Sequence, residues 1–385
     1  MYPDMILVVV AMDGNNNIFP VAWAVVVVEN KDSWKWFLSL LVNDIGMEEA
    51  RMEERAGITF MSDRQKGLLD ALKEVVPKAD VRFCVRHIWA NFKLQFPGQA
   101  YKDSFWRAAW ATTQGEFKCA LEEIKSLSTD AYNYVNGIPP VHWSRHAFST
   151  TCKSSMILNN LCETFNAVLK DARDKPILTC MEWLRRYVMK KMSEKRDGVL
   201  KYEKPFMPYI YKCFERLTSE TRYCKIHKAV DNKFEVDYKG NSWAVNLEDK
   251  TCNCRHWQLV GIPCTHDMAC IHNQRMRPIH FVDKAYSRET YLLAYTPVVN
   301  PMPGVSEWER TDHVQPLPPS MRKMPGRPSN KKRRKEADEA SKRKKAKRSV
   351  KCGNCGTLGH NIKSCKNAPS GICNSIKEQR RKTSN

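Results

Sequence analysis

Apolar runs of strand length alternate with helical patterns over the first part of the chain. Residues 5–11 and 19–29 are almost continuously apolar, and turn-forming residues lie between them, which predicts a β-hairpin covered on both faces. Two helices and two further strands follow in alternation. The helices are expected at residues 34–41 and 68–76, and the strands at residues 58–61 and 81–84. The order strand, strand, helix, strand, helix, strand predicts an α/β domain.

Polar and reactive side chains follow the last two predicted strands. Asp63 lies just beyond residues 58–61, and Cys84 and His87 lie at the end of residues 81–84. Both strand ends of a βαβ unit lie on the same edge of a parallel sheet, where ligands and catalytic groups gather. We therefore expect these three residues to face one crevice.

The segments LVVVAMDGNNNIFPVAWAVVVVENKDSWKWFL, ITFMSDRQKGLLDAL and FCVRHIWANF occur in this order. Together they resemble plant Mutator-like (MULE) transposases, and the resemblance covers residues 1–190. It implies a ribonuclease-H-like catalytic domain that uses two Asp and one Glu to hold divalent metal ions. Such ions, Mg²⁺ or Mn²⁺, stabilise the attacking and the leaving oxygen of a phosphodiester that is being cut.

By this resemblance Asp63 matches the second acid of the family and Glu163 the third. On its pattern alone, Glu163 is more simply a solvated helix residue. Cys84 and His87 resemble the Cys-x-x-His signature of the family. The other interpretation makes Cys84 a buried apolar residue and His87 a core or helix-capping histidine, because two ligands do not complete a zinc site.

The first acid of the family lies on a strand before the one that opens this chain. Asp4 is too close to the terminus to be held firmly, and Asp13 matches a non-catalytic position in the following turn. We therefore expect a ribonuclease-H-like sheet whose first strand is missing, in an N-terminally truncated chain. As it stands, the chain is expected not to be a competent transposase, because a missing carboxylate removes charge that metal binding needs.

Helical periodicity with many aromatic residues continues over residues 95–155. We expect a helical insertion there, placed before the helix that carries Glu163. Its core is expected to include Trp106, Trp110, Phe117, Leu121 and Ile124. The first domain is predicted to span residues 1–195, and the weakly patterned basic residues 196–230 are predicted to form a connecting segment.

A small metal-binding module is predicted over residues 231–275. Residues 233–238 and 242–247 alternate between polar and apolar around a turn, which predicts a β-hairpin. Cysteines and a histidine follow in a C-x-C…C-x-H order that suits tetrahedral Zn²⁺, and a module this small needs a metal to fold. The module resembles a SWIM zinc finger with all ligand positions intact. The ligands are Cys252, Cys254, Cys264 and His266.

Positive charge is concentrated at the end of the chain. Of 63 Lys/Arg and 42 Asp/Glu, 21 and 4 lie in residues 322–385, so a near-neutral body carries a strongly basic tail. The commonest partner of such a tail is a polyanion, with nucleic acid ahead of a membrane surface.

No apolar run approaches the roughly 20 residues that span a bilayer, and no signal peptide is expected.

Residues 295–350 are predicted to form a linker that is Pro-rich and then basic. Residues 325–328 (PGRP) resemble an AT-hook core, which lays its Arg along the minor groove of A·T-rich DNA; the simpler alternative is a plain linker. Two basic clusters about ten residues apart suit nuclear import, so a nuclear location is expected. The residues expected to bind nucleic acid are Arg327, Lys331, Lys332, Arg333, Arg334 and Lys335.

Residues 351–366 have the C-x2-C-x4-H-x4-C spacing of a CCHC zinc knuckle. Fifteen Cys in a chain without a secretion signal also indicate metal sites rather than disulfides, so two Zn²⁺ sites are expected. Knuckles generally contact single-stranded nucleic acid. Here Thr357 and Asn361 occupy the usual stacking positions, so protein contact is an alternative. The ligands are Cys352, Cys355, His360 and Cys365.

Intact zinc modules beside an incomplete acid set favour a zinc-binding, transposase-derived nuclear DNA-binding protein without catalytic activity. Plant far-red response regulators share this domain order. The alternative is an active Mutator-like transposase that cleaves and transfers DNA strands with Asp63, Glu163 and Mg²⁺ or Mn²⁺. A weaker alternative is RNA binding through the zinc knuckle. No membrane partner is expected.

Overall fold

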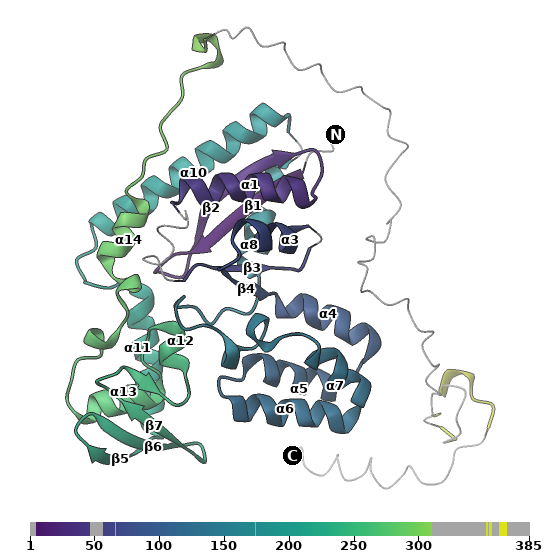
Figure 1. Cartoon of the computed structure of the whole chain (residues 1–385), viewed down its shortest axis with the longest axis vertical. Helices are drawn as coiled ribbons and strands as arrows, with labels where there is room; N and C mark the ends of the chain where they lie inside the picture. Colours follow the sequence, from purple (N-terminus) through teal and green to yellow (C-terminus); the bar gives the residue numbers. More distant parts are fainter. Residues whose placement is uncertain are drawn as a thin grey trace, which may run out of the picture. The chain divides into compact units, whose positions relative to one another are not determined.

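The computed structural model describes residues 5–46, 57–65, 67–173, 175–309, 352, 354–355 and 362–367. It contains two compact units, Met1–Asp338 and Glu339–Asn385. The first unit is a mixed α/β structure in which helices surround small sheets (Figure 1). Over the residues described, no helix combines the length and the apolar character that crossing a membrane requires.

The first unit opens with an antiparallel hairpin of β1 (Met5–Met12) and β2 (Ile18–Val26). Successive side chains of β1 point to opposite faces. Leu7 therefore packs with helices α1 and α3, while Val8 packs into a separate cluster with helices α8 and α10. The predicted hairpin that is covered on both faces is confirmed.

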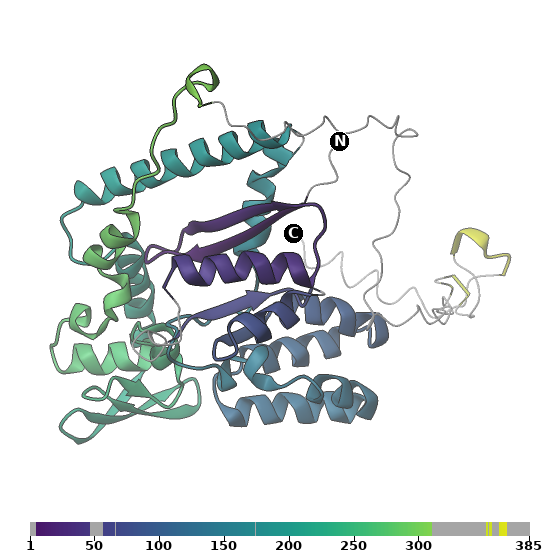
Figure 2. The same ribbon diagram turned by 45° about the horizontal axis from the view of Figure 1, so that its top comes forward.

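Two helices and two parallel strands follow in the predicted order. They are α1 (Lys31–Asp44), β3 (Thr59–Ser62), α3 (Leu68–Val75) and β4 (Asp80–Phe83). Helix α1 runs beside the hairpin (Figure 2) and buries Trp34 and Leu38 against Leu72 of α3. The strands form two separate two-stranded sheets, β1–β2 and β3–β4, where the sequence predicted one sheet. No described strand lies between β1 and β3 to bond to both.

The predicted helical insertion is present and is built around aromatic residues. Its helices are α4 (Val85–Gln95), α5 (Gln99–Trp110), α6 (Gln114–Leu127) and α7 (Thr129–Asn136). The Phe105 ring stacks on Trp143 at 5.4 Å, and both are fully buried. Trp110 was expected in this core, but it is 53% exposed because it is the last residue of α5.

The helix that carries Glu163 is short, and a still shorter helix and two longer ones follow it. The helices after the insertion are α8 (Asn160–Val168), α9 (Lys170–Arg173), α10 (Ile177–Leu200) and α11 (Pro208–Thr221). Sequence patterns missed α11, which buries Ile210 and Cys213 against Ile262 and Tyr286. Pro208 at its first turn is a helix-start signal that could have indicated it.

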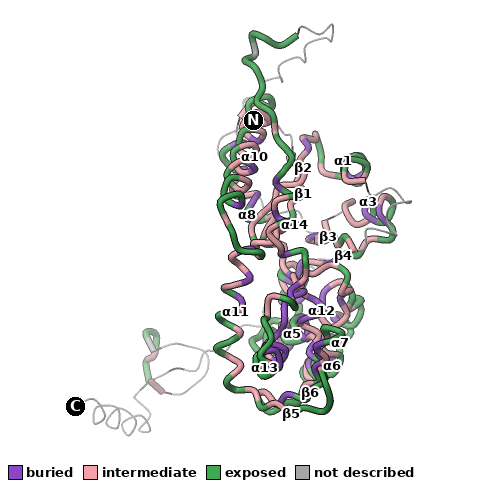
Figure 3. The backbone as a smooth tube through the Cα atoms, turned by 90° about the vertical axis from the view of Figure 1, so that its left-hand side faces the viewer, coloured by how far each residue is buried: buried purple, intermediate pink, exposed green. Residues whose placement is uncertain are grey.

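The predicted hairpin of the second module is confirmed as β6 (Lys233–Tyr238) and β7 (Asn241–Asn246). Two further strands, β5 (Lys225–Val230) and β8 (Thr251–Cys252), extend it to an antiparallel four-stranded sheet. The helices after it are α12 (His256–Val260), α13 (Thr265–Asn273) and α14 (Arg288–Tyr295). Helix α13 is buried from His266 to Ile271 (Figure 3).

The second module packs directly on the insertion, and the flanking helices α11 and α14 contact the hairpin. Leu259 of α12 belongs to the same buried cluster as Phe105 of the insertion. The Tyr295 hydroxyl of α14 donates to Asp13 at 2.8 Å, and the Tyr209 backbone N–H donates to Asn15 at 2.9 Å. Parts of the chain 282 residues apart are therefore in direct contact.

Candidate zinc centre and acidic edge

Four buried side chains converge at the end of the second module. Cys252 ends β8, Cys254 follows in a turn, Cys264 is the N-cap of α13 and His266 lies in its first turn. Their ligand atoms all lie within 4.8 Å of one another. His266 Nδ1 is 3.5 Å from Cys252 Sγ and 3.3 Å from Cys264 Sγ. A tetrahedral zinc with ordinary Zn–S and Zn–N bonds separates such atoms by about 3.5 Å, so the set fits Zn²⁺.

The charges of these thiols also suit a cation. Hydrogen bonds from Cys252 and Cys264 lower the pKa of Cys254. Burial raises the pKa of Cys264, which is 4% exposed. One thiolate is thus favoured at the expense of its neighbours, because several negative charges cannot share a buried site. A dication removes this conflict, since zinc binds thiolates.

Two residues that sequence analysis did not identify hold the ligands in place. Asp267, fully buried, accepts a hydrogen bond from the Cys264 backbone N–H at 2.8 Å and completes a capping box. Burial, and then the Cys254 charge, raise the pKa of Asp267 to about 7. Gln258 accepts from the Cys252 N–H at 3.3 Å and donates to its carbonyl at 3.0 Å. An acid at the third position of a helix is a capping signal that could have indicated Asp267.

Aromatic rings orient the histidine ligand. The His266 ring stacks on Trp243 with centroids 5.1 Å apart and planes 16° apart, and it meets Tyr238 edge-on at 5.3 Å. Its Nε2 is buried and has no hydrogen-bond partner among the described residues. Packing, rather than an acceptor, therefore turns Nδ1 towards the thiols.

Three of the predicted knuckle ligands come together in the second unit. The thiols of Cys352, Cys355 and Cys365 lie within 4.8 Å of one another. The Asn354 side chain donates to Cys365 Sγ at 3.4 Å. His360 lies outside the described residues, so the fourth ligand and the second zinc stay predictions.

The full chain purified with zinc is expected to contain about two Zn²⁺ per molecule, because each tetrahedral set holds one ion. Deleting residues 351–366 should lower the content by one, as measured by plasma mass spectrometry. Cys373→Ser changes a tail cysteine outside the ligand set and should leave the content unchanged. One zinc in the full chain, unaffected by the deletion, would contradict a knuckle site.

The parallel strands bring the predicted acid and the Cys-x-x-His residues to one edge. Asp63 directly follows β3, and Cys84 directly follows β4 as the N-cap of α4. The Cys84 backbone N–H donates to the Ser62 carbonyl at 2.8 Å, so the two strand ends are adjacent. The catalytic or structural roles of these residues stay predictions.

Cys84 and His87 shift each other's pKa, and the charges of both acids act on His87. Interaction with Cys84 raises the pKa of His87 against the effect of burial, and the charges of Asp63 and Glu163 raise it further. Burial of Cys84 would raise the pKa of this thiol, but hydrogen bonds from His87 and from the Asn159 backbone lower it overall. The edge therefore gathers two carboxylates, a thiol and an imidazole.

Glu163 lies on the exposed side of α8 and is paired with a cation. Its carboxylate is 2.5 Å from an Arg86 guanidinium nitrogen, and Arg86 also donates to Asn160 at 2.8 Å. Within the described part of the chain, the two Cys-rich sets are the only groups of three or more ligands within 4.8 Å. Asp63 and Glu163 thus belong to no such group among these residues.

Asp13 serves the hairpin turn rather than this edge. Its carboxylate accepts hydrogen bonds from the backbone N–H groups of Asn15 (2.9 Å) and Asn17 (2.7 Å), and from the Tyr295 hydroxyl. The Asn17 side chain donates to it as well. A carboxylate with these donors is a structural acceptor. Asp4 lies outside the described residues, as do the six basic residues predicted to bind nucleic acid.

Comparison with protein families defines the class of the molecule. Residues 2–91 match the MULE transposase domain, and residues 234–269 match the SWIM zinc finger. The chain is therefore a zinc-binding protein related to Mutator-like transposases. The resemblance seen in the sequence extends over residues 1–190, and the match covers the first half of this range. No curated protein and no solved structure gives a significant match.

Proposed function

We propose that this chain is a nuclear, transposase-derived DNA-binding protein that holds its fold with zinc and does not cut DNA. The proposal includes a ribonuclease-H-like ancestry for the first domain and a second zinc in the knuckle. The observation that carries it is the contrast between two sites. All four SWIM ligands converge at zinc-binding distances. Glu163, in contrast, forms an ion pair with Arg86 and belongs to no cluster of three or more metal-binding side chains in the described part of the chain.

DNA binding is assigned to the basic tail on grounds of charge. Residues 322–350 contain 14 Lys/Arg, and residues 1–321 have a net charge of only +4. Each phosphate neutralised by Lys or Arg releases counterions, which favours binding and makes it sensitive to salt. Arg327 would add a preference for A·T-rich DNA by lying in its narrow minor groove.

Deleting residues 322–350 is expected to weaken binding to a duplex by about 100-fold or more at roughly 0.1 M salt, measured by fluorescence anisotropy. The slope of log affinity against log salt should flatten by about 0.9 for each phosphate that the tail no longer neutralises. A scrambled tail of the same composition should keep the affinity, whereas Arg327→Ala should reduce only the preference for A·T-rich duplexes. Undiminished affinity after the deletion would contradict the proposal.

Nuclear import is attributed to the clusters at residues 331–335 and 342–348. A fluorescent fusion of the full chain should collect in the nucleus. Changing the five basic residues of the first cluster to Gln should redistribute it to the cytoplasm. A cytoplasmic wild-type fusion would argue against nuclear function.

The alternative, an active transposase, is favoured by one feature: Asp63 and Glu163 both lie close enough to His87 to raise its pKa. Our proposal predicts no strand cleavage of supercoiled DNA by the full chain with Mg²⁺ or Mn²⁺. Asp63→Asn should leave DNA affinity unchanged, because Asp63 is not part of the basic tail. Metal-dependent nicking that Asp63→Asn abolishes, and that the exposed-site control Asp44→Asn does not, would establish the enzyme instead.

A further inference from the structure

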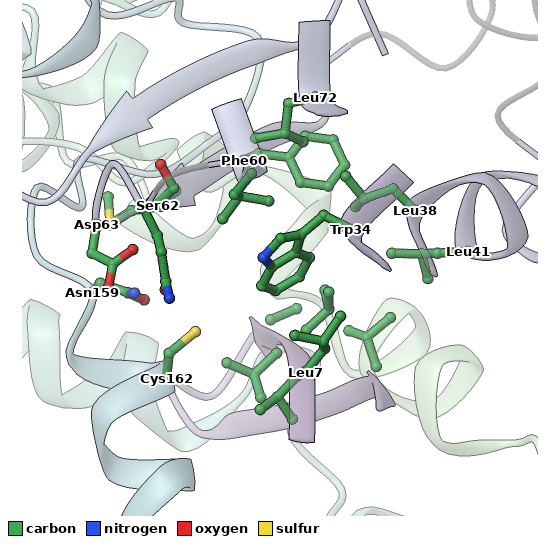
Figure 4. Close-up of a pocket in the computed structure, with 18 of the residues that line it drawn as sticks. Leu7, Trp34, Leu38, Leu41, Phe60, Ser62, Asp63, Leu72, Asn159 and Cys162 are labelled. Carbon is green, nitrogen blue, oxygen red and sulfur yellow. The ribbon is translucent and has the colours of Figure 1, made fainter. Parts of the chain in front are cut away.

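Two of the cavities that border the N-terminal hairpin differ in chemistry. The larger, of about 680 Å³, is lined mainly by apolar side chains, among them Leu7, Trp34 and Leu38 (Figure 4). The smaller, of about 220 Å³, lies at the turn of the hairpin, and its lining includes the cationic residues Arg145 and Lys153. We call this smaller space the turn cavity. Cationic side chains in the wall of a small cavity suit an anionic ligand.

The cations of the turn cavity contact backbone carbonyls instead of carboxylates. Lys153 Nζ donates to the carbonyls of Thr150 at 3.0 Å and of Gln258 at 3.2 Å. Arg145 Nε donates to the Ser155 carbonyl at 2.8 Å. Neither cation forms a salt bridge with a described residue. Their positive charges are therefore balanced by dipoles alone, although buried charges are normally paired.

A third cation, Arg82, lies behind the wall of the turn cavity and is only 3% exposed. Its guanidinium donates to the carbonyl of Ser154, a lining residue, at 2.6 Å. Burial lowers the pKa of Arg82, and the charges of Cys152 and Asp80 only partly oppose this effect. Burial and then the Arg82 charge lower the pKa of Arg145. Guanidinium groups nevertheless stay charged in proteins, so an anion in the cavity would relieve their repulsion.

Several hydrogen-bond donors of the turn cavity are left for a ligand. The two terminal nitrogens of Arg145 bond to no described residue. Lys153 has three N–H donors and uses two of them. The Ser154 hydroxyl accepts from the Met156 N–H at 3.3 Å, which leaves its own proton to donate. The donors of three side chains therefore surround one small space.

Asp13 is the acidic residue among the described residues that line the turn cavity. Its carboxylate accepts hydrogen bonds from the backbone N–H groups of Asn15 and Asn17 and from the Tyr295 hydroxyl. These donors hold it in the hairpin turn, and it pairs with none of the cations. An anion is therefore drawn to the opposite wall, where Arg145 lies.

Charge and donor geometry favour a phosphate group over a carboxylate. A carboxylate carries one negative charge and two acceptor oxygens, whereas a phosphate monoester carries nearly two charges and three such oxygens. The terminal nitrogens of a guanidinium match a pair of phosphate oxygens, and an ammonium group adds a point charge. We propose that the turn cavity binds one phosphate group through Arg145, Lys153 and the Ser154 hydroxyl. The proposal does not rest on DNA binding by the basic tail.

The zinc-loaded full chain is expected to bind inorganic phosphate, measured by isothermal titration calorimetry at constant ionic strength. Arg145→Gln removes the charge and the forked donors, so it should weaken binding at least tenfold. Arg145→Lys keeps the charge without the fork and should weaken binding less. Arg277→Gln, at an exposed residue outside the lining, should leave binding unchanged. Absence of phosphate binding, or equal losses for Arg145→Gln and Arg277→Gln, would overturn the proposal.

The wild-type chain provides a second test that does not need a folded variant. Phosphate and sulfate should raise the melting temperature and slow amide exchange in residues 145–156 more than chloride does at the same ionic strength. Equal effects of the three anions would overturn the proposal, because the anions would then only screen the repulsion between Arg82 and Arg145.

A duplex DNA decides the source of the phosphate group. If the site takes a phosphate of the nucleic-acid backbone, the duplex should displace inorganic phosphate, and Arg145→Gln should lower the duplex affinity of the full chain at least threefold. If it takes a free phosphate or a small phosphorylated molecule, Arg145→Gln should weaken phosphate binding and leave duplex affinity unchanged. Failure of the tail to bind DNA would leave phosphate binding at Arg145 unaffected, so the two proposals fail separately.

Discussion

Cys264→Ser is expected to remove one zinc and to lower the melting temperature of the whole first unit, and not only of the finger. Structural zinc contributes on the order of 10 kcal/mol to folding, and loss of a ligand forfeits much of it. The finger cannot unfold alone, because Leu259 is buried with Phe105 of the insertion. Arg255 also donates to the Phe148 carbonyl at 3.1 Å, and Tyr286 donates to the Val260 carbonyl at 2.8 Å.

The matched control is Cys270→Ser. Cys270 is fully buried on the same helix, α13, but it is not one of the converging ligands. This variant should keep both zinc ions and lose only about 1–2 kcal/mol of stability, as expected for a polar hydroxyl in a buried site. Zinc content by plasma mass spectrometry and unfolding by calorimetry separate the two variants. A two-step melt for Cys264→Ser, with the helical insertion unaffected, would show that the finger is independent.

Asp13→Ala is expected to lower the free energy of unfolding by about 2–4 kcal/mol, because hydrogen bonds to a charged acceptor are strong and their loss leaves donors unpaired. The carboxylate joins the turn of the hairpin, through Asn15 and Asn17, to the Tyr295 hydroxyl of α14. Urea denaturation followed by circular dichroism measures the change.

Asp44→Ala is the control, since Asp44 is exposed at the last position of α1. It should change stability by less than about 0.5 kcal/mol. A double-mutant cycle with Tyr295→Phe should give a coupling energy of about 1 kcal/mol or more, because the two side chains share a hydrogen bond. Unchanged stability of Asp13→Ala would leave Asp13 free for another role at the site.

Patterns of short range in the sequence predicted the local elements well. Continuous apolar runs indicated β1 and β2, and the turn formers between them indicated an antiparallel pair, which the register confirms. The C-x-C…C-x-H spacing indicated the zinc ligands, because ligand type and spacing are themselves the chemistry of a tetrahedral site. Helix α11 was missed because its buried residues pack on Ile262 and Tyr286, which lie far along the chain, and strand β5 was missed because it has no buried residue and no apolar alternation.

Local sequence patterns therefore predict the order of the first strands and helices, the hairpin of the finger and the four Cys and His residues that converge in it. How these parts meet depends on contacts between segments that lie far apart in the sequence. Burial of Leu259 among the aromatic residues of the insertion joins the finger to the transposase-like domain, and Arg86 neutralises Glu163 across 77 residues. In the folded chain, residues of β1 and β3 also line one cavity. Such contacts depend on which surfaces are brought together, and local periodicity does not encode that choice.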